Sequence, residues 1–422
     1  MESRVALVLT CAALSAILPK PSAASAPITT SQTASTMSRT QAPQIHAAAV
    51  QRANALALDV YRAAAANKAD NIALSPLGIE AAMVAMNAGA RGATAEEINA
   101  LVRAPGGAGP ATQDVFDAYT DVLTPGHRNG SYTLELSTRI WAAQMASIEP
   151  TYAASCARLH CDAPTTVDFR QADAVARNVN EWIAAKTNHR IEKLIDARAI
   201  DPRMLLLLGN AVYFKADWNS KFLPERTEQA NFFVDAKTTA RVPMMHSATE
   251  TFGYASFPDC EVVQMMYAQP SNLTMVVVLP KPNVAVAAVE QKLTGATWDE
   301  WMAGLRGRQV DLFLPRFKAE SHLSLGQTLS TLGMKRAFTG DSDFTGLSKT
   351  PGVFFSDVVH GATVEVDEHG TVAAAATITP FVTAAPGERE TPVVFRADRP
   401  FLFAIRDRRT GALMFLGRVT KP

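Results

Sequence analysis

The chain lacks an excess of charge of either sign. Its 422 residues include 40 Lys and Arg against 40 Asp and Glu, so the formal net charge is 0 at pH 7. A nucleic-acid-binding protein needs a basic surplus to displace counterions from phosphate, and we therefore expect no nucleic-acid partner. Apolar residues make up 48% of the chain, which is enough for the sizeable core of an ordinary globular protein.

The sequence also has no apolar run long enough to span a bilayer. The longest, residues 5–18, has about fourteen residues, whereas a membrane-spanning helix needs about twenty. Arg4 precedes this run and the small residues 22–26 follow it, a pattern that predicts a secretory signal peptide cleaved after Ala24. We therefore expect residues 1–24 to be a signal peptide, the protein to be secreted (extracellular or periplasmic), and no membrane partner.

Cysteine is scarce. The sequence has 4 cysteines, and Cys11 lies within the predicted signal peptide. The others, Cys156, Cys161 and Cys260, are odd in number, so a disulfide framework does not hold this fold together. Cys156 and Cys161 are near enough in sequence for one local bridge. The alternative is buried free thiols that pack as small apolar groups.

The sequence motifs of common enzyme classes are absent as well. The chain contains no GxSxG, HExxH, P-loop or GxGxxG motif. Its 8 histidines are scattered, and none pairs at metal-ligand spacing. We therefore expect no metal and no cofactor, and we predict that the chain is not an enzyme; a hydrolase has only the length of the chain in its favour.

Residues 25–44 are mainly Ser, Thr, Ala, Gln and Pro, and they predict a disordered tail because they cannot bury enough apolar surface to offset ordering. From Ile45 onward no linker separates domains, so residues 45–422 are predicted to form a single domain. Helical and strand patterns alternate first and strand patterns dominate later, which favours an α+β fold. The predicted helices start at residue 45 and cover 79–87, 94–102 and 173–187, with Thr94 and Glu97 at capping-box spacing; the predicted strands are 71–75, 132–142, 204–214, 262–267, 273–279, 310–317, 401–406 and 413–419.

One segment carries a more specific signal. A strand pattern ends at residues 365–368 and continues through Gly370 and Thr371 into four alanines. This segment resembles the hinge of the reactive-centre loop in serpins, the serine protease inhibitor family. The corresponding hinge residues are Glu368, Gly370, Thr371, Val372, Ala373, Ala374, Ala375 and Ala376.

Three further blocks resemble serpin motifs in the expected order and spacing. Residues 71–76 are similar to the NxxxSP segment, and residues 210–218 are similar to the NAxYFKGxW strand, with Ala216 in place of the usual Gly. Residues 399–403 and 415–419 resemble the C-terminal hairpin. The resemblance covers residues 45–422 and implies the serpin fold, with about eight or nine helices around three β-sheets and an exposed reactive-centre loop.

The resemblance also implies that the loop inserts into a sheet as a new strand. Side chains alternate along a strand, so one face receives Thr371, Ala373, Ala375 and Thr377, none of which is large or charged. Inserting roughly a dozen residues forms about as many hydrogen bonds, each worth about 1 kcal/mol net. We expect insertion to add these hydrogen bonds without removing any existing contact. Pro380 has no N–H to donate, so we expect the inserted strand to stop short of it or to bulge there. Before cleavage, we expect Thr371 to lie at the edge of the sheet or in solvent.

The reactive bond can be placed by counting. Inhibitory serpins keep a nearly fixed length from the hinge glutamate to the residue that enters the protease pocket, and seventeen residues counted from Glu368 end at Ala384 (384 − 368 + 1 = 17). The resemblance therefore implies a reactive bond between Ala384 and Ala385. Arg389 is the competing position, but it would lengthen the inserting segment by five residues (389 − 384 = 5).

Five further residues match positions around the point where a serpin sheet opens. Ser75, Asn210 and His360 match the polar cluster beneath the opening, called the shutter. Trp218 matches the tryptophan at the top of the sheet, called the breach. Arg316 matches the partner of Glu368 in a pair that bridges neighbouring strands there; the alternative is two independent surface charges.

The resemblance implies an inhibitory serpin, an irreversible suicide-substrate inhibitor that traps the acyl-enzyme of its target. A small residue at Ala384 suits a secreted elastase-like or subtilisin-like serine protease with a shallow pocket, with a papain-like cysteine protease as a further target. We expect the inhibitor to be a monomer. The alternative is a non-inhibitory serpin-fold binding or chaperone protein that is cleaved only as a substrate, but no residue from Thr371 to Ala376 is charged.

Overall fold

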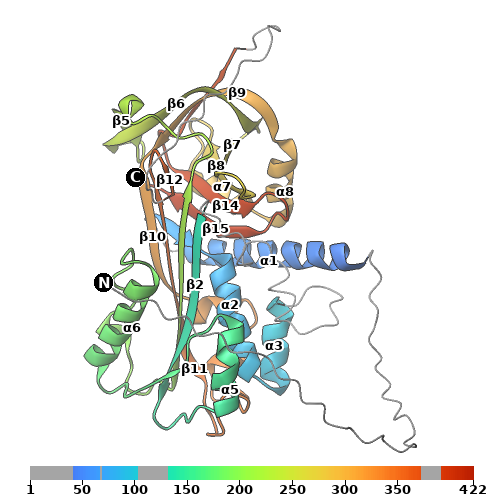
Figure 1. Ribbon diagram of the computed structural model, residues 1–422, viewed down its shortest axis with the longest axis vertical. Coiled ribbons are helices and arrows are strands. Elements are labelled where there is room, and N and C mark those ends of the chain that lie inside the picture. Colours follow the sequence, from blue (N-terminus) through green and yellow to red (C-terminus); the bar gives the residue numbers. More distant parts are fainter. Residues whose placement is uncertain (1–40, 67–68, 103–131, 372–390) are drawn as a thin grey trace, which may run out of the picture. The chain divides into compact units, whose positions relative to one another are not determined.

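The computed structural model describes residues 41–66, 69–102, 132–371 and 391–422, and the structural statements below concern these parts of the chain (Figure 1). Several predictions lie outside the described residues: the signal peptide, residues 25–40 of the tail, Val372 to Ala376 of the hinge, and the Ala384–Ala385 bond. No described helix is both long enough and apolar enough to cross a membrane.

The described residues form eight α-helices, and each predicted helix is found near its expected position. The helices are α1 (Gln41–Ala65), α2 (Pro76–Gly89), α3 (Gly92–Val102), α5 (Pro150–Ser155), α6 (Ala172–Lys186), α7 (Val286–Lys292), α8 (Gly295–Gly304) and α9 (Gly326–Thr331). Helix α1 begins at Gln41, four residues before the expected Ile45 (45 − 41 = 4).

The predicted capping box at α3 is wrong. The helix begins at Gly92, so Thr94 lies inside its first turn rather than before it. The Thr94 hydroxyl accepts the Asp343 N–H at 2.9 Å, and the Glu97 carboxylate accepts the Arg336 N–H at 2.7 Å. Both side chains therefore bind a segment far along the chain instead of the helix start, and tertiary contacts have overridden the local signal.

One sheet has six strands in the order β10-β11-β12-β4-β2-β3. Their bounds are β10 (Phe317–Ser324), β11 (Phe355–Val366), β12 (Gly370–Thr371), β4 (Leu206–Asp217), β2 (Tyr132–Ala143) and β3 (Thr165–Val167). Strand β4 is covered on both faces, as its apolar run predicts. On one face Leu207 lies in a cluster with Trp182 of α6, and on the other Leu208 belongs to the main core with α2, so α6 and α2 flank the long strands in Figure 1.

The second sheet has nine strands, eight of them in the order β1-β15-β14-β8-β7-β6-β9-β13, while β5 pairs with β6. Their bounds are β1 (Ile72–Leu74), β5 (Glu228–Phe233), β6 (Thr239–Ser256), β7 (Cys260–Met266), β8 (Leu273–Pro280), β9 (Arg306–Pro315), β13 (Val393–Arg396), β14 (Phe401–Asp407) and β15 (Leu413–Val419). The described strands thus form two sheets, whereas three were expected. The long strand β6 pairs with β5, β7 and β9 and so joins these strands in one sheet; its register against β9 shifts between Ser247 and Glu250. The strand expected over 310–317 is divided at Arg316 into the end of β9 and the start of β10.

Candidate functional site

Two residues of the hinge, Gly370 and Thr371, already lie inside the six-stranded sheet as strand β12. Strand β12 is antiparallel to both of its neighbours, with Thr371 opposite Val366 of β11 and Ala216 of β4. Thr371 is 0% exposed. The expectation that Thr371 lies at an edge or in solvent before cleavage is therefore wrong for this structure, in which the intact loop starts as a short central strand.

A tight turn after β11 directs the hinge back into the sheet. The Asp367 carboxylate accepts the N–H groups of His369 at 2.9 Å and Gly370 at 3.2 Å, and the Asp367 N–H donates to the Gly370 carbonyl at 3.0 Å. A Cβ atom at Gly370 would lie 2.0 Å from the Ala216 carbonyl oxygen. Only glycine therefore allows β12 to approach β4 this closely.

Two stacked aromatic residues, Trp218 and Tyr267, contact the inserted hinge and the turn before it. Trp218 stacks on Tyr267 with ring centroids 4.6 Å apart, and the Tyr267 hydroxyl lies 2.7 Å from the Thr371 hydroxyl. The Trp218 indole N–H donates to the Asp367 carbonyl at 2.9 Å, and the Trp218 backbone N–H donates to the His369 carbonyl at 2.8 Å. Trp218 therefore contacts the turn and, through Tyr267, the hinge.

Arg316 and Glu368 form an ion pair beside the hinge. The Arg316 Nε lies 2.8 Å from both Glu368 carboxylate oxygens, and the Glu368 side chain is only 3% exposed. Burial disfavours the Glu368 charge, but hydrogen bonds from Arg316 and Thr227 outweigh burial and hold the pKa of Glu368 below its usual value. The two residues are therefore not independent surface charges in this structure.

Ser75, Asn210 and His360 meet beneath the hinge in one buried network. His360 Nε2 accepts the Ser75 N–H at 3.0 Å, and its Nδ1 lies 2.9 Å from the Asn210 side-chain oxygen. The Asn210 amide donates to the Thr138 hydroxyl at 3.0 Å. Burial lowers the pKa of His360 to about 3, so the ring is neutral, and a proton on Nδ1 satisfies both of its hydrogen bonds.

This network crosses the seam at which a new strand would enter. Strands β11 and β4 pair directly in parallel from Phe355↔Leu206 to Thr363↔Tyr213, with His360 opposite Asn210. Further insertion must separate these strands and break the His360–Asn210 hydrogen bond. The expectation that insertion removes no contact is therefore wrong.

Three residues of the site carry no signal in the sequence. Thr138 lies within a predicted strand, Tyr267 at the end of another, and Thr227 near η4 (Pro224–Arg226), a short 3-10 turn. Their roles depend on partners 72, 104 and 141 residues away along the chain. Only the three-dimensional structure brings these partners together.

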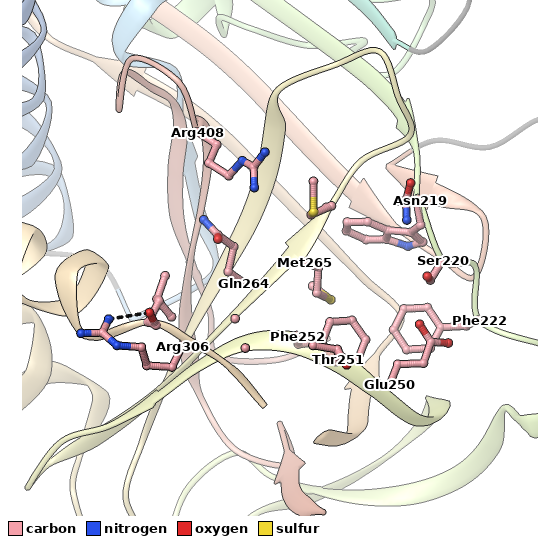
Figure 2. A pocket seen from close by; sticks show the side chains of 15 residues that line it. Asn219, Ser220, Phe222, Glu250, Thr251, Phe252, Gln264, Met265, Arg306 and Arg408 are labelled. Atoms are coloured by element: carbon pink, nitrogen blue, oxygen red, sulfur yellow. Dashed lines mark hydrogen bonds between the residues drawn. The ribbon is translucent and has the colours of Figure 1, made fainter. Parts of the chain in front are cut away.

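A cavity of about 300 Å³ has Trp218 in its lining; Figure 2 shows the side chains around it. Trp218, Phe222 and Met265 contribute apolar wall, while the Arg306 guanidinium is turned back onto the Leu305 carbonyl at 2.8 Å. Of the predicted site residues that the structure describes, Trp218 alone lines this cavity. The cavity is therefore a neighbour of the breach and separate from the shutter network.

The geometry thus places β12 in the seam between the parallel strands β4 and β11, above the network of Ser75, Asn210 and His360. The model of the family described as Serpin (serine protease inhibitor) matches residues 51–422. This chain belongs to the serpin family. The family model carries the description of a serine protease inhibitor and relatives are named as inhibitors, so the chain is classed with protease inhibitors and not with enzymes.

Individual relatives agree with this assignment. The leukocyte elastase inhibitor of Sus scrofa is 33% identical over 378 residues, covering 87% of this chain and 97% of the relative. Iripin-2 of Ixodes ricinus is 36% identical over 382 residues, covering 87% and 92%. The solved thyroxine-binding globulin complex with thyroxine superposes with a TM-score of 0.77 at 26% identity, covering 89% of this chain and 99% of that one.

Proposed function

We propose that this serpin is an inhibitory one, an irreversible suicide-substrate inhibitor of a secreted elastase-like or subtilisin-like serine protease. The loop is cut between Ala384 and Ala385 while the protease is bound to it as an acyl-enzyme, and the loop then enters the sheet and carries the protease along. A papain-like cysteine protease is a further target class. The protein acts as a secreted monomer.

The observation that carries this proposal is the position of β12. Gly370 and Thr371 already occupy the slot between β4 and β11, so continued insertion extends a strand that has begun rather than starting a new one. Extending a ladder adds about one hydrogen bond per residue fixed, each worth about 1 kcal/mol net. The hinge residues that follow Thr371 in the sequence are small and uncharged, which suits a central strand.

The target class follows from the small residue at the proposed bond. Ala384 fits a shallow protease pocket, and several relatives of this chain are leukocyte elastase inhibitors by name. A trypsin-like pocket binds the long cationic side chain of Lys or Arg, so it should not bind Ala384.

The test mixes the purified protein with pancreatic elastase, subtilisin and trypsin, and resolves the products on a denaturing gel. We expect an SDS-resistant complex with elastase or subtilisin and a released C-terminal fragment that begins at Ala385 by mass spectrometry. Trypsin should form no complex with the native loop, whereas Ala384→Arg should gain one. Arg389→Ala is the matched control and should change neither result; a cut at Arg389 would contradict the placement of the bond.

The alternative is a non-inhibitory serpin that binds or chaperones a partner. The likeness to the thyroxine-binding globulin structure supports keeping this alternative. Complete cleavage at Ala384–Ala385 by both elastase and subtilisin, with no stable complex, would favour the alternative over inhibition.

A further inference from the structure

Two cysteines meet where one helical segment ends. Helix α5 continues into the 3-10 turn η2 (Cys156–Leu159), which ends at His160 in the left-handed conformation with a φ of 49°. The N–H groups of His160 and Cys161 both donate to the Cys156 carbonyl, that of Cys161 at 3.0 Å. The bond from Cys161 is the six-to-one bond of a Schellman-type helix end, a motif that brings the side chains of its first and last residues together. Those residues are Cys156 and Cys161.

Both thiols are buried and lie close to each other. Cys156 is 1% exposed and Cys161 is 5% exposed. The two thiols are not bonded to each other in this structure: Cys156 Sγ donates to the Tyr152 carbonyl at 3.5 Å and Cys161 Sγ to the Asp162 carbonyl at 3.4 Å. They are nevertheless close enough to perturb each other, since the neighbouring thiol lowers the pKa of Cys156 and raises that of Cys161. Cys260, on β7, is also buried but has no sulfur partner among the described residues.

The two cysteines belong to segments with different anchors. The segment of Cys156 is fixed to α2, because the Tyr152 hydroxyl donates to the Ala85 carbonyl at 2.7 Å. Cys161 forms a β-bridge with Thr138 of β2, and the next N–H, from Asp162, donates to the Thr138 carbonyl at 2.7 Å. A covalent bond between the two sulfurs would therefore tie the start of η2 to Cys161 and, through its bridge to Thr138, to β2, the strand that flanks β4.

We propose that Cys156 and Cys161 are a disulfide site, oxidised during folding by a disulfide-bearing oxidant. The Cys156 thiolate attacks the oxidant's disulfide to give a mixed disulfide and releases one thiol; the Cys161 sulfur then displaces the second thiol and closes the Cys156–Cys161 bond. The two protein thiols lose two electrons and two protons, and the oxidant becomes two thiols. Because both sulfurs are buried in the folded protein, exchange takes place before this region has packed, and the finished bond is shielded from reductants.

The test refolds the full chain in a buffer of oxidised and reduced glutathione, alkylates it in denaturant and maps the peptides by mass spectrometry. We expect Cys156 and Cys161 to be joined and Cys260 to be alkylated. Dithiothreitol should break the bond much more slowly in the folded protein than in denaturant. Alkylation of all three residues, or a glutathione adduct at Cys156 without a bridge, would overturn the proposal.

A second measurement separates a bridge from a packing effect. The oxidised protein should melt at a higher temperature than its reduced form, because the bridge limits the unfolded chain. Cys156→Ala and Cys161→Ala should each abolish this redox-dependent shift, and the control Cys260→Ala should retain it. The same shift in Cys156→Ala would overturn the proposal, and neither outcome depends on whether the protein inhibits a protease.

Discussion

The Tyr267 hydroxyl lies 2.7 Å from the Thr371 hydroxyl, and both residues are 0% exposed. This contact joins the core of the nine-stranded sheet to the hinge of the loop. Tyr267 also stacks on Trp218, whose indole holds the turn before the hinge. The start of the loop is thus held by residues from separate parts of the chain, and a substitution at Thr371 acts on the intact protein as well as on insertion.

Thr371→Arg should convert the inhibitor into a substrate. A guanidinium in this slot would be buried without a partner, at a cost of several kcal/mol, whereas a two-residue strand supplies only a few hydrogen bonds of about 1 kcal/mol each. Charge burial therefore outweighs pairing, β12 leaves the sheet, and the acyl-enzyme hydrolyses before insertion can trap it. The measurement is the ratio of SDS-resistant complex to cleaved protein after reaction with elastase.

Thr371→Ser, which keeps the hydroxyl opposite Tyr267, is the matched control and should retain most of the complex. The melting temperature of intact Thr371→Arg should fall only modestly: β4 and β11 stay paired when β12 leaves, but the buried Tyr267 hydroxyl loses its partner at a cost of about 1–3 kcal/mol. A full yield of complex from Thr371→Arg would show that trapping does not require this residue inside the sheet.

The sequence predicted the parts of this site that local patterns specify. Helix and strand patterns located α2, β4 and β11, and the resemblance to serpins implied that Glu368 and Arg316 are partners, with two independent surface charges as the alternative. Tyr267 was missed because its role depends on a contact 104 residues away in sequence. The sequence also did not predict that Gly370 and Thr371 already lie between β4 and β11. Strand alternation indicates which side chains share a face, but it does not indicate whether the strand has already entered the sheet.

The free energy of unfolding should decrease as the pH is lowered, because His360 is buried in its neutral form. Its pKa is about 3 in the folded protein, against about 6.5 in an unfolded chain. Between these values the unfolded chain binds a proton that the folded protein does not, so the free energy of unfolding decreases as the pH falls, by up to about 1.4 kcal/mol per pH unit. Urea unfolding at pH 7, 6, 5 and 4 measures this slope.

His360→Gln should reduce the slope between pH 6 and pH 4 by up to about 1.4 kcal/mol per pH unit, which is the contribution of one proton. The variant should also be less stable than the parent at pH 7, because the buried network is disturbed. The exposed His322→Gln serves as the control and should leave most of the slope in place. An unchanged slope in His360→Gln would mean that other groups cause the acid sensitivity.

A buried ion pair should dominate the stability of the region where α1, α7 and β15 meet. Arg418 Nη1 lies 3.0 and 3.1 Å from the Glu290 carboxylate oxygens, and the Tyr61 hydroxyl donates to the same carboxylate. Glu290→Ala leaves a buried guanidinium without its carboxylate, which costs about 3–5 kcal/mol. Calorimetry should detect a clearly lower melting temperature, while the exposed Glu300→Ala on α8 should stay within about 0.5 kcal/mol of the parent. Equal losses for the two variants would contradict this assignment.

Cleavage of the loop should raise the melting temperature. Insertion must first separate β4 from β11, which removes one parallel ladder and the His360–Asn210 hydrogen bond. The inserted strand then forms two antiparallel ladders in place of the one lost, and antiparallel pairing is slightly more stable per residue. The net gain is about ten hydrogen bonds of about 1 kcal/mol each, which corresponds to about 20 °C at about 2 °C per kcal/mol.

Calorimetry of intact and loop-cleaved protein measures the difference, and cleaved Thr371→Arg should show a much smaller rise because its hinge cannot start the strand. Equal melting temperatures for intact and cleaved parent protein would mean that the loop stays outside the sheet after cleavage.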